Sequence, residues 1–209
     1  MRSLPNLAML VSGLLLTSLA LAAEPASEEP SRIRLYGRVG YSAGGEKIVS
    51  GTYVNTGDTY NITAGGGTSG ALGVELRATD NIAVLVSVGS QKDKTDATNG
   101  ELKFARSFKE VIGFYGLTPQ WRVGAGVRQD SDAKFTWRHD TAGAGSREFD
   151  NANGVVLEAQ YFFFPPNTKA SHSLQTGVSF RVIQQKFKDK VAGKSYDGNQ
   201  IGATLFFYY

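Results

Sequence analysis

Hydrophobic and polar residues alternate along most of the chain with a period of two, which predicts β-strands with one apolar and one polar face. The last nine residues read I-G-A-T-L-F-F-Y-Y, with Ile201, Leu205 and Tyr209 on one face of the predicted strand and Thr204 on the other. In water, an apolar strand with unpaired edge groups would template aggregation. Such a strand is stable where it closes a barrel whose outer face contacts lipid.

Seven upstream segments repeat this alternation, which makes eight predicted strands in total. They are residues 33–42, a segment that ends near Ala78, and residues 82–89, 104–117, 121–128, 155–163 and 174–182. The outward face of segment 104–117 is ambiguous, because either Val111 and Tyr115 or Phe108 and Ile112 fit it.

The connections between the segments alternate in length. Residues 79–81, 118–120 and 164–171 are short turns, whereas residues 44–67, 90–101, 130–153 and 186–199 form long polar connections. Short turns on one side and long loops on the other are typical of outer-membrane barrels with both termini in the periplasm. We therefore predict an all-β protein, an eight-stranded antiparallel transmembrane up-and-down β-barrel.

A soluble barrel of lipocalin type, with its apolar face inward, is the main alternative. Two features favour the membrane: the polar faces carry few Lys, Asp or Glu residues, and aromatic residues lie near the predicted strand ends, as in interfacial girdles. These aromatics are Tyr41 and Phe104 beside long loops, and Trp121, Tyr161, Phe163, Phe207 and Tyr209 beside short turns.

The N-terminus has the pattern of a bacterial signal peptide. Arg2 precedes an apolar stretch from Leu7 to Leu21, and the small residues Ala20 and Ala22 form a cleavage site. We expect a signal peptide at residues 1–22, a periplasmic tail at 23–31 and a barrel at 32–209; an uncleaved membrane anchor is the alternative. The chain has no cysteine, and its formal charge of +3 gives no reason to expect a nucleic-acid partner.

Several charged residues fall on the polar, inward faces of the strands. They are Arg34, Arg38, Glu75, Arg77, Glu110, Arg122, Arg128, Glu158 and Arg181. Charges in a narrow lumen must be paired, or they carry a large desolvation cost. The set predicts either an ion-pair network that plugs the barrel or a solute path lined with arginine. The plug is favoured, because eight strands enclose only enough space for side chains.

With its signal peptide, strand order and closing strand, the chain resembles the small eight-stranded outer-membrane barrels, which include the OmpA transmembrane domain, OmpX and the opacity and Ail-type surface proteins. The resemblance implies a bacterial outer-membrane location, contact with membrane lipid and lipopolysaccharide, and recognition by the barrel-assembly machinery. The assembly signal that it implies comprises Gln200, Gly202, Leu205, Phe207 and Tyr209.

Some barrels of this size are lipid A-modifying enzymes, which need a histidine beside a serine and an acid. His139 is near Asp140 and Ser146 in a glycine-rich segment, and His172 adjoins Ser173, whose side chain points to the opposite face of a strand. We therefore expect no catalytic residues, no cofactor and no metal site.

The long connections are the remaining functional surface. We take Trp137, Lys186, Lys188, Lys190 and Lys194 as candidates for contact with a lipopolysaccharide phosphate, an acidic host polymer or another surface ligand. The predicted role is structural and adhesive, in a monomeric barrel; the alternative is a channel for small or hydrophobic solutes.

Overall fold

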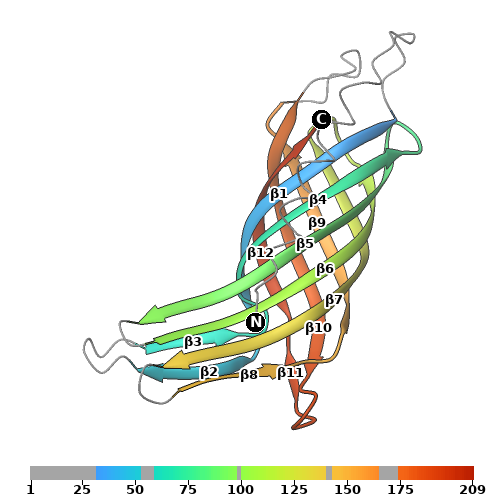
Figure 1. Ribbon diagram of the computed structural model, residues 1–209. Helices are drawn as coiled ribbons and strands as arrows, with labels where there is room; N and C mark the ends of the chain where they lie inside the picture. The colour runs from blue at the N-terminus through green and yellow to red at the C-terminus, as the bar shows by residue number, and fades with distance from the viewer. Residues whose placement is uncertain (1–31, 53–58, 98–99, 140–142, 165–173) are drawn as a thin grey trace, which may run out of the picture.

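The computed structural model describes residues 32–52, 59–97, 100–139, 143–164 and 174–209, most of which lie in strands (Figure 1). The predicted signal peptide and periplasmic tail, together with His172, lie outside the described residues. Within the described ranges there is no helix with the length and apolar character needed to cross a membrane.

Eight strands form the wall of a closed barrel. They are β1 (Ile33–Gly44), β4 (Gly67–Arg77), β5 (Ile82–Ala97), β6 (Gly100–Gly116), β7 (Trp121–His139), β9 (Ala152–Phe162), β10 (Gln175–Lys188) and β12 (Gln200–Tyr208). Each strand pairs antiparallel with the next, and β12 pairs with both β10 and β1, where Leu205 lies opposite Val178 and Val39. The predicted eight-stranded up-and-down barrel is therefore confirmed.

Four shorter strands lie in the regions predicted as long loops. They are β2 (Lys47–Thr52), β3 (Thr59–Thr63), β8 (Gly143–Glu148) and β11 (Ser195–Asp197). Strands β2 and β3 form a separate hairpin, β8 pairs with β7, and β11 pairs with β10. At the end opposite the C-terminus, β5, β6 and β7 run beyond the barrel and project to one side, with β2, β3 and β8 beside them (Figure 1).

The expectation that residues 90–101 and 130–153 are loops was thus wrong for most of their length. Strand β5 continues to Ala97 and β7 to His139, where both are paired. A strand in water needs no apolar outer face, so the alternation that marked the membrane-spanning part stops before the hydrogen-bonded ladder does. The sequence pattern therefore marks the part of each strand whose outer face is apolar, and not the full length of the strand.

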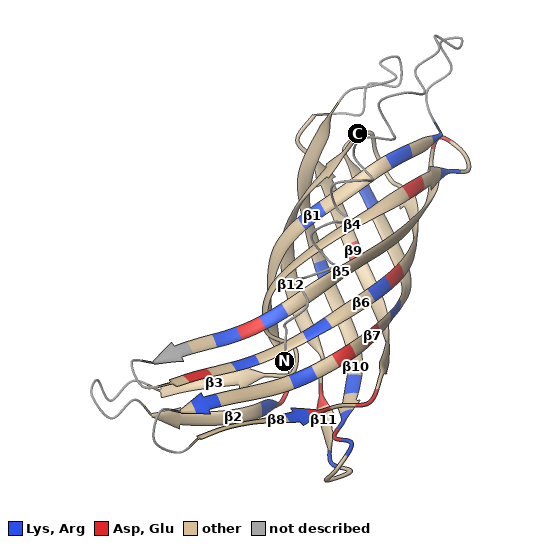
Figure 2. Ribbon diagram, viewed as in Figure 1, with Lys and Arg blue, Asp and Glu red and all other residues tan. Residues whose placement is uncertain are grey.

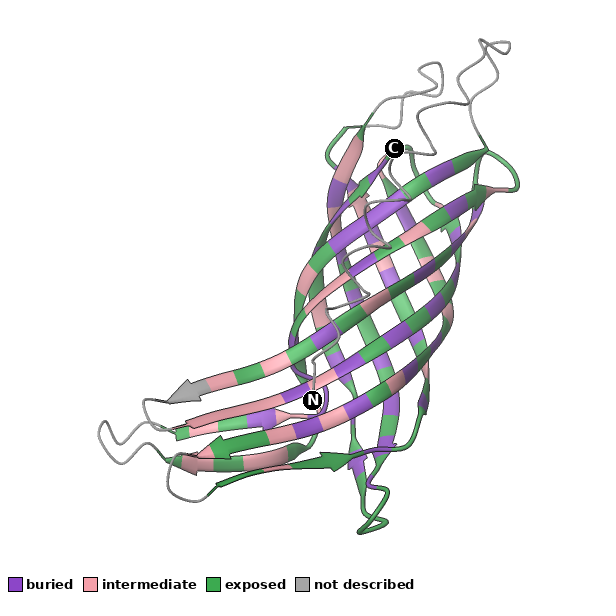
Figure 3. Cartoon of the chain, in the orientation of Figure 1, coloured by how far each residue is buried: buried purple, intermediate pink, exposed green. Residues whose placement is uncertain are grey.

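Side chains alternate between a buried inner face and an exposed outer face along every barrel strand (Figure 3). In β6 this alternation decides the ambiguous register, because Val111 and Tyr115 are exposed whereas Phe108 and Ile112 are buried. Phe104 has the same parity as Phe108 and is completely buried. Its predicted place in an outer aromatic girdle was therefore wrong.

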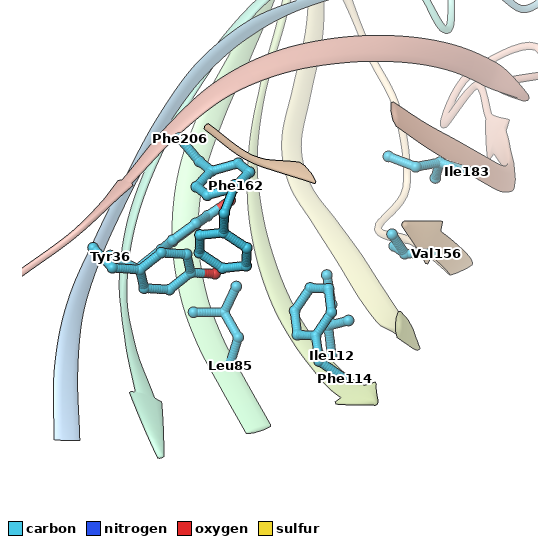
Figure 4. Close-up of a cluster of buried hydrophobic side chains, with 9 residues drawn as sticks. Tyr36, Leu85, Ile112, Phe114, Val156, Phe162, Ile183 and Phe206 are labelled. Carbon is cyan, nitrogen blue, oxygen red and sulfur yellow. The ribbon is translucent and has the colours of Figure 1, made fainter. Parts of the chain in front are cut away.

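Two apolar clusters fill the interior at different levels. The first, which we call the lower cluster, lies inside the barrel towards the short turns and contains Tyr36, Leu85, Ile112, Phe114, Val156, Phe162, Ile183, Phe206 and Tyr208 (Figure 4). The second, the upper cluster, lies towards the long connections and contains Ile62, Ala64, Phe104, Ala133, Phe135, Phe149, Ala152, Phe187 and Tyr196. Charged side chains lie between these clusters and also among the rings of the lower cluster.

Candidate functional site

The centre of the lumen is organised around one carboxylate, that of Glu110 on β6. Its oxygens lie 3.1 Å from the guanidinium of Arg38, 3.1 Å from that of Arg128 and 2.8 Å from that of Arg181. These four side chains come from β6, β1, β7 and β10 and are almost completely buried. Arg181 also reaches Glu158 on the neighbouring β9, at 3.0 Å. The network therefore links walls of the barrel that are not adjacent.

A second ion cluster surrounds Glu75 on β4, nearer the short turns. The guanidinium of Arg122 lies 2.7 Å from Glu75, Arg34 donates hydrogen bonds to the same carboxylate, and Arg77 lies 3.8 Å from it. The Arg122 guanidinium also lies over the ring of Phe114, with 4.3 Å to the centroid, and donates a hydrogen bond to the Tyr208 hydroxyl. The ion cluster around Glu75 is thus packed among the aromatic rings of the lower cluster.

All nine charged residues predicted on the inner faces lie on the lumen side of the wall. Eight are buried, and Arg77, close to the short-turn end, is partly exposed. Figure 2 shows blue and red positions along the barrel strands as well as on the projecting strands.

Two members of the network were missed by the sequence reasoning. Arg106 and Asp130 are fully buried, and their charged groups are 3.3 Å apart, while Asp130 also pairs with Arg128 at 2.8 Å. The signal was available, because Arg106 continues the inward parity of Phe108 and Glu110, and Asp130 continues that of Arg128. Asp130 lies beyond the predicted strand 121–128, whereas Arg106 lies within the predicted strand 104–117, whose outward face the sequence leaves ambiguous.

A layer of amides closes the lumen above Glu110. The side-chain nitrogen of Gln91 donates to the hydroxyl of Ser42 and to the side-chain oxygen of Gln200, each at 2.7 Å. Arg128 donates to Gln91 at 3.1 Å, which joins this layer to the ion network. A lumen cavity beside these residues has a volume of about 10 Å³, which is room for about one water molecule. The described side chains therefore fill the interior at this level.

The β2–β3 hairpin covers the upper cluster. Ile62 of β3 and the nearby Ala64 are completely buried as members of this cluster. The backbone amide of Thr63 donates a hydrogen bond to the carboxylate of Asp93 on β5, at 2.9 Å. Phe104 makes edge-to-face contacts with Phe149 and Phe187, with ring centroids 5.3 and 5.6 Å away. We call the hairpin and the upper cluster together the cap.

The candidate contact residues of the long connections have different environments. The ammonium of Lys190 lies 3.3 Å from Glu148, and that of Lys194 lies 3.2 Å from Glu46. Lys186 and Lys188 lie exposed on the outer face of β10, and neither forms an ion pair with any described residue. Trp137 lies on the projecting part of β7, where its ring stacks on Phe135 and covers Gly145 of β8.

Two carboxylates near this surface have lowered pKa values. A hydrogen bond from Lys190, with the charges of Lys190 and Lys134, lowers the pKa of Glu148. The pKa of Asp189 is lowered mainly because the backbone amide of Ala192 donates to its carboxylate, helped by the amide of Val191 and by Arg147. Both groups are therefore charged at neutral pH and fix the turn that follows β10.

The histidine considered for catalysis is not beside its candidate serine. His139 is paired with Gly143, whereas Ser146 is paired with Thr136, three positions along β7. At about 3.3 Å per residue, the two side chains are on the order of 10 Å apart, too far for proton transfer. Asp140 lies outside the described residues. Among the residues that are described, no three His, Cys, Asp or Glu side chains form a group that could hold a metal ion.

The sequence matches no protein-family model, and it matches no curated protein. Several solved structures have a similar chain path. Ail, the attachment invasion locus protein of Yersinia pestis, gives a TM-score of 0.48 at 9% identity, covering 85% of this chain and 97% of that one. Neisserial surface protein A gives 0.47 at 11% identity, covering 84% and 96%. The N-terminal barrel of Pseudomonas aeruginosa OprF gives 0.35 at 11% identity, covering 86% and 98%.

The decisive observation is the outer surface of the closed barrel itself. Exposed apolar side chains such as Val39, Leu72, Val127, Phe180 and Leu205 form a continuous band around it, and a band of this kind is stable only in lipid. The chain is a transmembrane β-barrel. Its location is the bacterial outer membrane, where closed antiparallel barrels of eight strands with short periplasmic turns occur.

In this barrel, the residues of the expected assembly signal occupy both faces of β12. Leu205, Phe207 and Tyr209 point towards lipid, and the ring of Phe207 covers Gly37 on β1. Gln200 points inward and is buried in the amide layer. Recognition by the assembly machinery stays a prediction.

Proposed function

We propose that this outer-membrane barrel is a non-conducting structural protein that supports the envelope and presents its cap as an extracellular contact surface. The observation that carries the proposal is the filled lumen. Glu110 and its three arginines span the barrel, with an aromatic cluster on one side and the amide layer and cap on the other. A solute path would require many of these buried contacts to break together.

The contact surface is proposed to be basic. Lys186 and Lys188 lie exposed on the outer face of β10, next to the turn held by Asp189. Because Lys190 and Lys194 already pair with acids of the same surface, Lys186 and Lys188 are the candidates that best support contact with an acidic polymer.

The structural role is tested with purified full-length protein in planar bilayers. We expect no reproducible conductance step, and a consistent single-channel step would overturn the proposal in favour of the channel. A deletion strain should show increased envelope permeability with an unchanged lipid A pattern, since a changed pattern would indicate an enzyme.

The surface role is tested by binding to dextran sulfate at low and high salt. The double variant Lys186→Gln/Lys188→Gln should bind several-fold more weakly at low salt, whereas Lys190→Gln/Lys194→Gln, which removes equal charge, should lose less. An equal loss of binding in the two double variants would indicate that binding depends on net charge rather than on Lys186 and Lys188.

A further inference from the structure

An apolar groove indents the outer wall of the barrel over five neighbouring strands, β10, β12, β1, β4 and β5. It has a volume of about 740 Å³. Small residues, Gly70, Ser90 and Ala203, form its floor, and larger side chains such as Val39, Tyr41 and Phe180 border it. All six point outward, on the face that carries the apolar belt, and the lumen network takes no part in the groove.

Gly70 is the position where the groove depends most clearly on the absence of a side chain. A Cβ atom placed there would have the carbonyl oxygen of Arg38 as its nearest neighbour, 3.8 Å away, so nothing in the protein occupies that space. Gly37, on the outer face of β1, also lacks a side chain, but there the Phe207 ring fills the space. The wall is therefore smooth beside Phe207 and hollow at Gly70.

The groove lies in the half of the apolar belt that is nearer the cap. Its residues on β4, Thr68 and Gly70, lie at the end of that strand that begins at Gly67. Its residues on β1, Val39 and Tyr41, lie in the half of that strand that ends at Gly44. In the membrane this half faces the outer leaflet. The surroundings of the groove are then hydrocarbon chains, which fit an apolar depression without leaving a backbone group unpaired.

A positive charge stands at the cap-proximal rim. Lys92 follows Ser90 on the same outward face of β5 and is paired with Thr68, another groove residue. It is exposed and forms no ion pair with any described residue. A long side chain at this depth can extend along the wall to the interface, with its ammonium in the headgroup layer.

From these positions we propose that the groove is a binding site for an acyl chain of a phosphorylated outer-leaflet lipid, with Lys92 on its phosphate. A second copy of the barrel fits less well. A two-fold pair built on this patch would bring the two Lys92 side chains to the same depth on opposing walls, and like charges repel. This inference concerns the outer wall and does not depend on whether the lumen conducts.

The chain provides matched controls for a test. Gly113 on β6 also faces outward, and a Cβ there would meet only the carbonyl oxygen of Ala125, 3.9 Å away, but Gly113 does not line the groove. Gly70→Leu fills the groove, whereas Gly113→Leu adds the same side chain elsewhere on the lipid-facing wall. Lys109, which is likewise exposed and paired with Val88 beside the belt, provides the matched charge control for Lys92.

The measurement is native mass spectrometry of the full-length protein in detergent with defined lipids, each variant being checked first for heat-modifiable folding. The wild type and Gly113→Leu should retain one diphosphoryl lipid A, and Gly70→Leu should retain it at least about tenfold less well. Lys92→Gln should weaken retention of diphosphoryl lipid A several-fold, whereas Lys109→Gln should leave it unchanged. Neither substitution should alter the weaker retention of dephosphorylated lipid A. If Gly70→Leu does not fold, Ala203→Leu replaces it, with Ala125→Leu as its control.

Equal retention of lipid A by the wild type and the groove-filling variant would overturn the site. Equal retention of diphosphoryl lipid A and dephosphorylated lipid A by the wild type would overturn the role of the phosphate. A wild-type dimer that the groove-filling variant dissociates would assign the groove to a second copy and also overturn the proposal.

Discussion

The Nη2 atom of Arg181 on β10 lies 2.8 Å from the Oε2 atom of Glu110 on β6, across the lumen from one wall of the barrel to another. Arg38 and Arg128 reach the same carboxylate from β1 and β7. One acidic side chain thus compensates part of the charge of three buried arginines. Its removal leaves those arginines short of a counter-ion in a region of low dielectric constant.

The first prediction follows from that arrangement. Glu110→Ala should lower the free energy of unfolding by about 3–5 kcal/mol, the usual cost of breaking a buried ion pair from one side. Urea unfolding in lipid vesicles, followed by the fluorescence of Trp121 and Trp137, measures the loss. Glu148→Ala, at an exposed ion pair, should change the value by less than about 1 kcal/mol. Similar losses in the two variants would contradict a special role for Glu110.

The parity of the last strand makes a second prediction. Tyr208 is completely buried and bonded to Arg122, whereas Tyr209 is exposed to lipid. Tyr208→Ala should therefore destabilise the barrel by about 3–5 kcal/mol, the range for a large aromatic side chain lost from a core. Tyr209→Ala should cost much less in the same urea titration. A larger effect at Tyr209 would mean that the register of β12 is wrong.

A third prediction concerns closure of the barrel. The backbone groups of Tyr209 and Leu35 exchange two hydrogen bonds, at 2.7 and 2.9 Å, and Phe207 packs over Gly37. Deleting residues 207–209 removes these contacts and should abolish the heat-modifiable, compact form on gel electrophoresis. The substitution Phe164→Ala, at an exposed residue of the short-turn end, serves as the control and should retain it. Normal assembly of the truncated chain would refute the role assigned to this end of β12.

The turn after β10 should depend on pH through Asp189. Because its folded-state pKa is lowered, this carboxylate stabilises the turn fully above the ordinary aspartate pKa of about 4. The stabilisation is lost as the pH falls through the lowered pKa. The amide resonances of Val191 and Ala192 should therefore shift together on acidification, and Asp189→Asn should remove that transition. If Asp189→Asn showed the same transition, the transition would belong to another group. Asp150→Asn is the matched control and should keep the transition.

The β2–β3 hairpin should unfold separately from the barrel when its packing on the upper cluster is loosened. Ile62 is completely buried in the upper cluster, so Ile62→Ala should cost about 2–5 kcal/mol locally. Faster amide exchange in β3, with unchanged exchange in β1 and β12, is the expected result, because β2 and β3 pair only with each other. Thr52→Ala, at an exposed site of the hairpin, should leave exchange unchanged. Faster exchange throughout the barrel would show that the hairpin and the barrel form one cooperative unit.

Much of the charged lumen could be predicted from period-two parity alone, because a residue's face follows from its position once one member of the strand is assigned. Glu75, Arg122 and Glu158 were placed inward on that basis. Which acid meets which base could not be predicted in the same way. Glu110 and Arg181 are 71 residues apart and on strands that do not pair, and they meet only because the sheet closes on itself.

Alternation, short turns and an apolar closing strand were enough to predict the class of fold and the lipid around its outer surface, since they leave few other ways to accommodate the apolar face. The length of β5 and β7, the inward position of Phe104 and the covering of the upper cluster by the β2–β3 hairpin became known only from the folded chain. Lipid imposes its pattern on a strand locally. Above the membrane, strands and hairpin are held by contacts between distant residues, which no local period encodes.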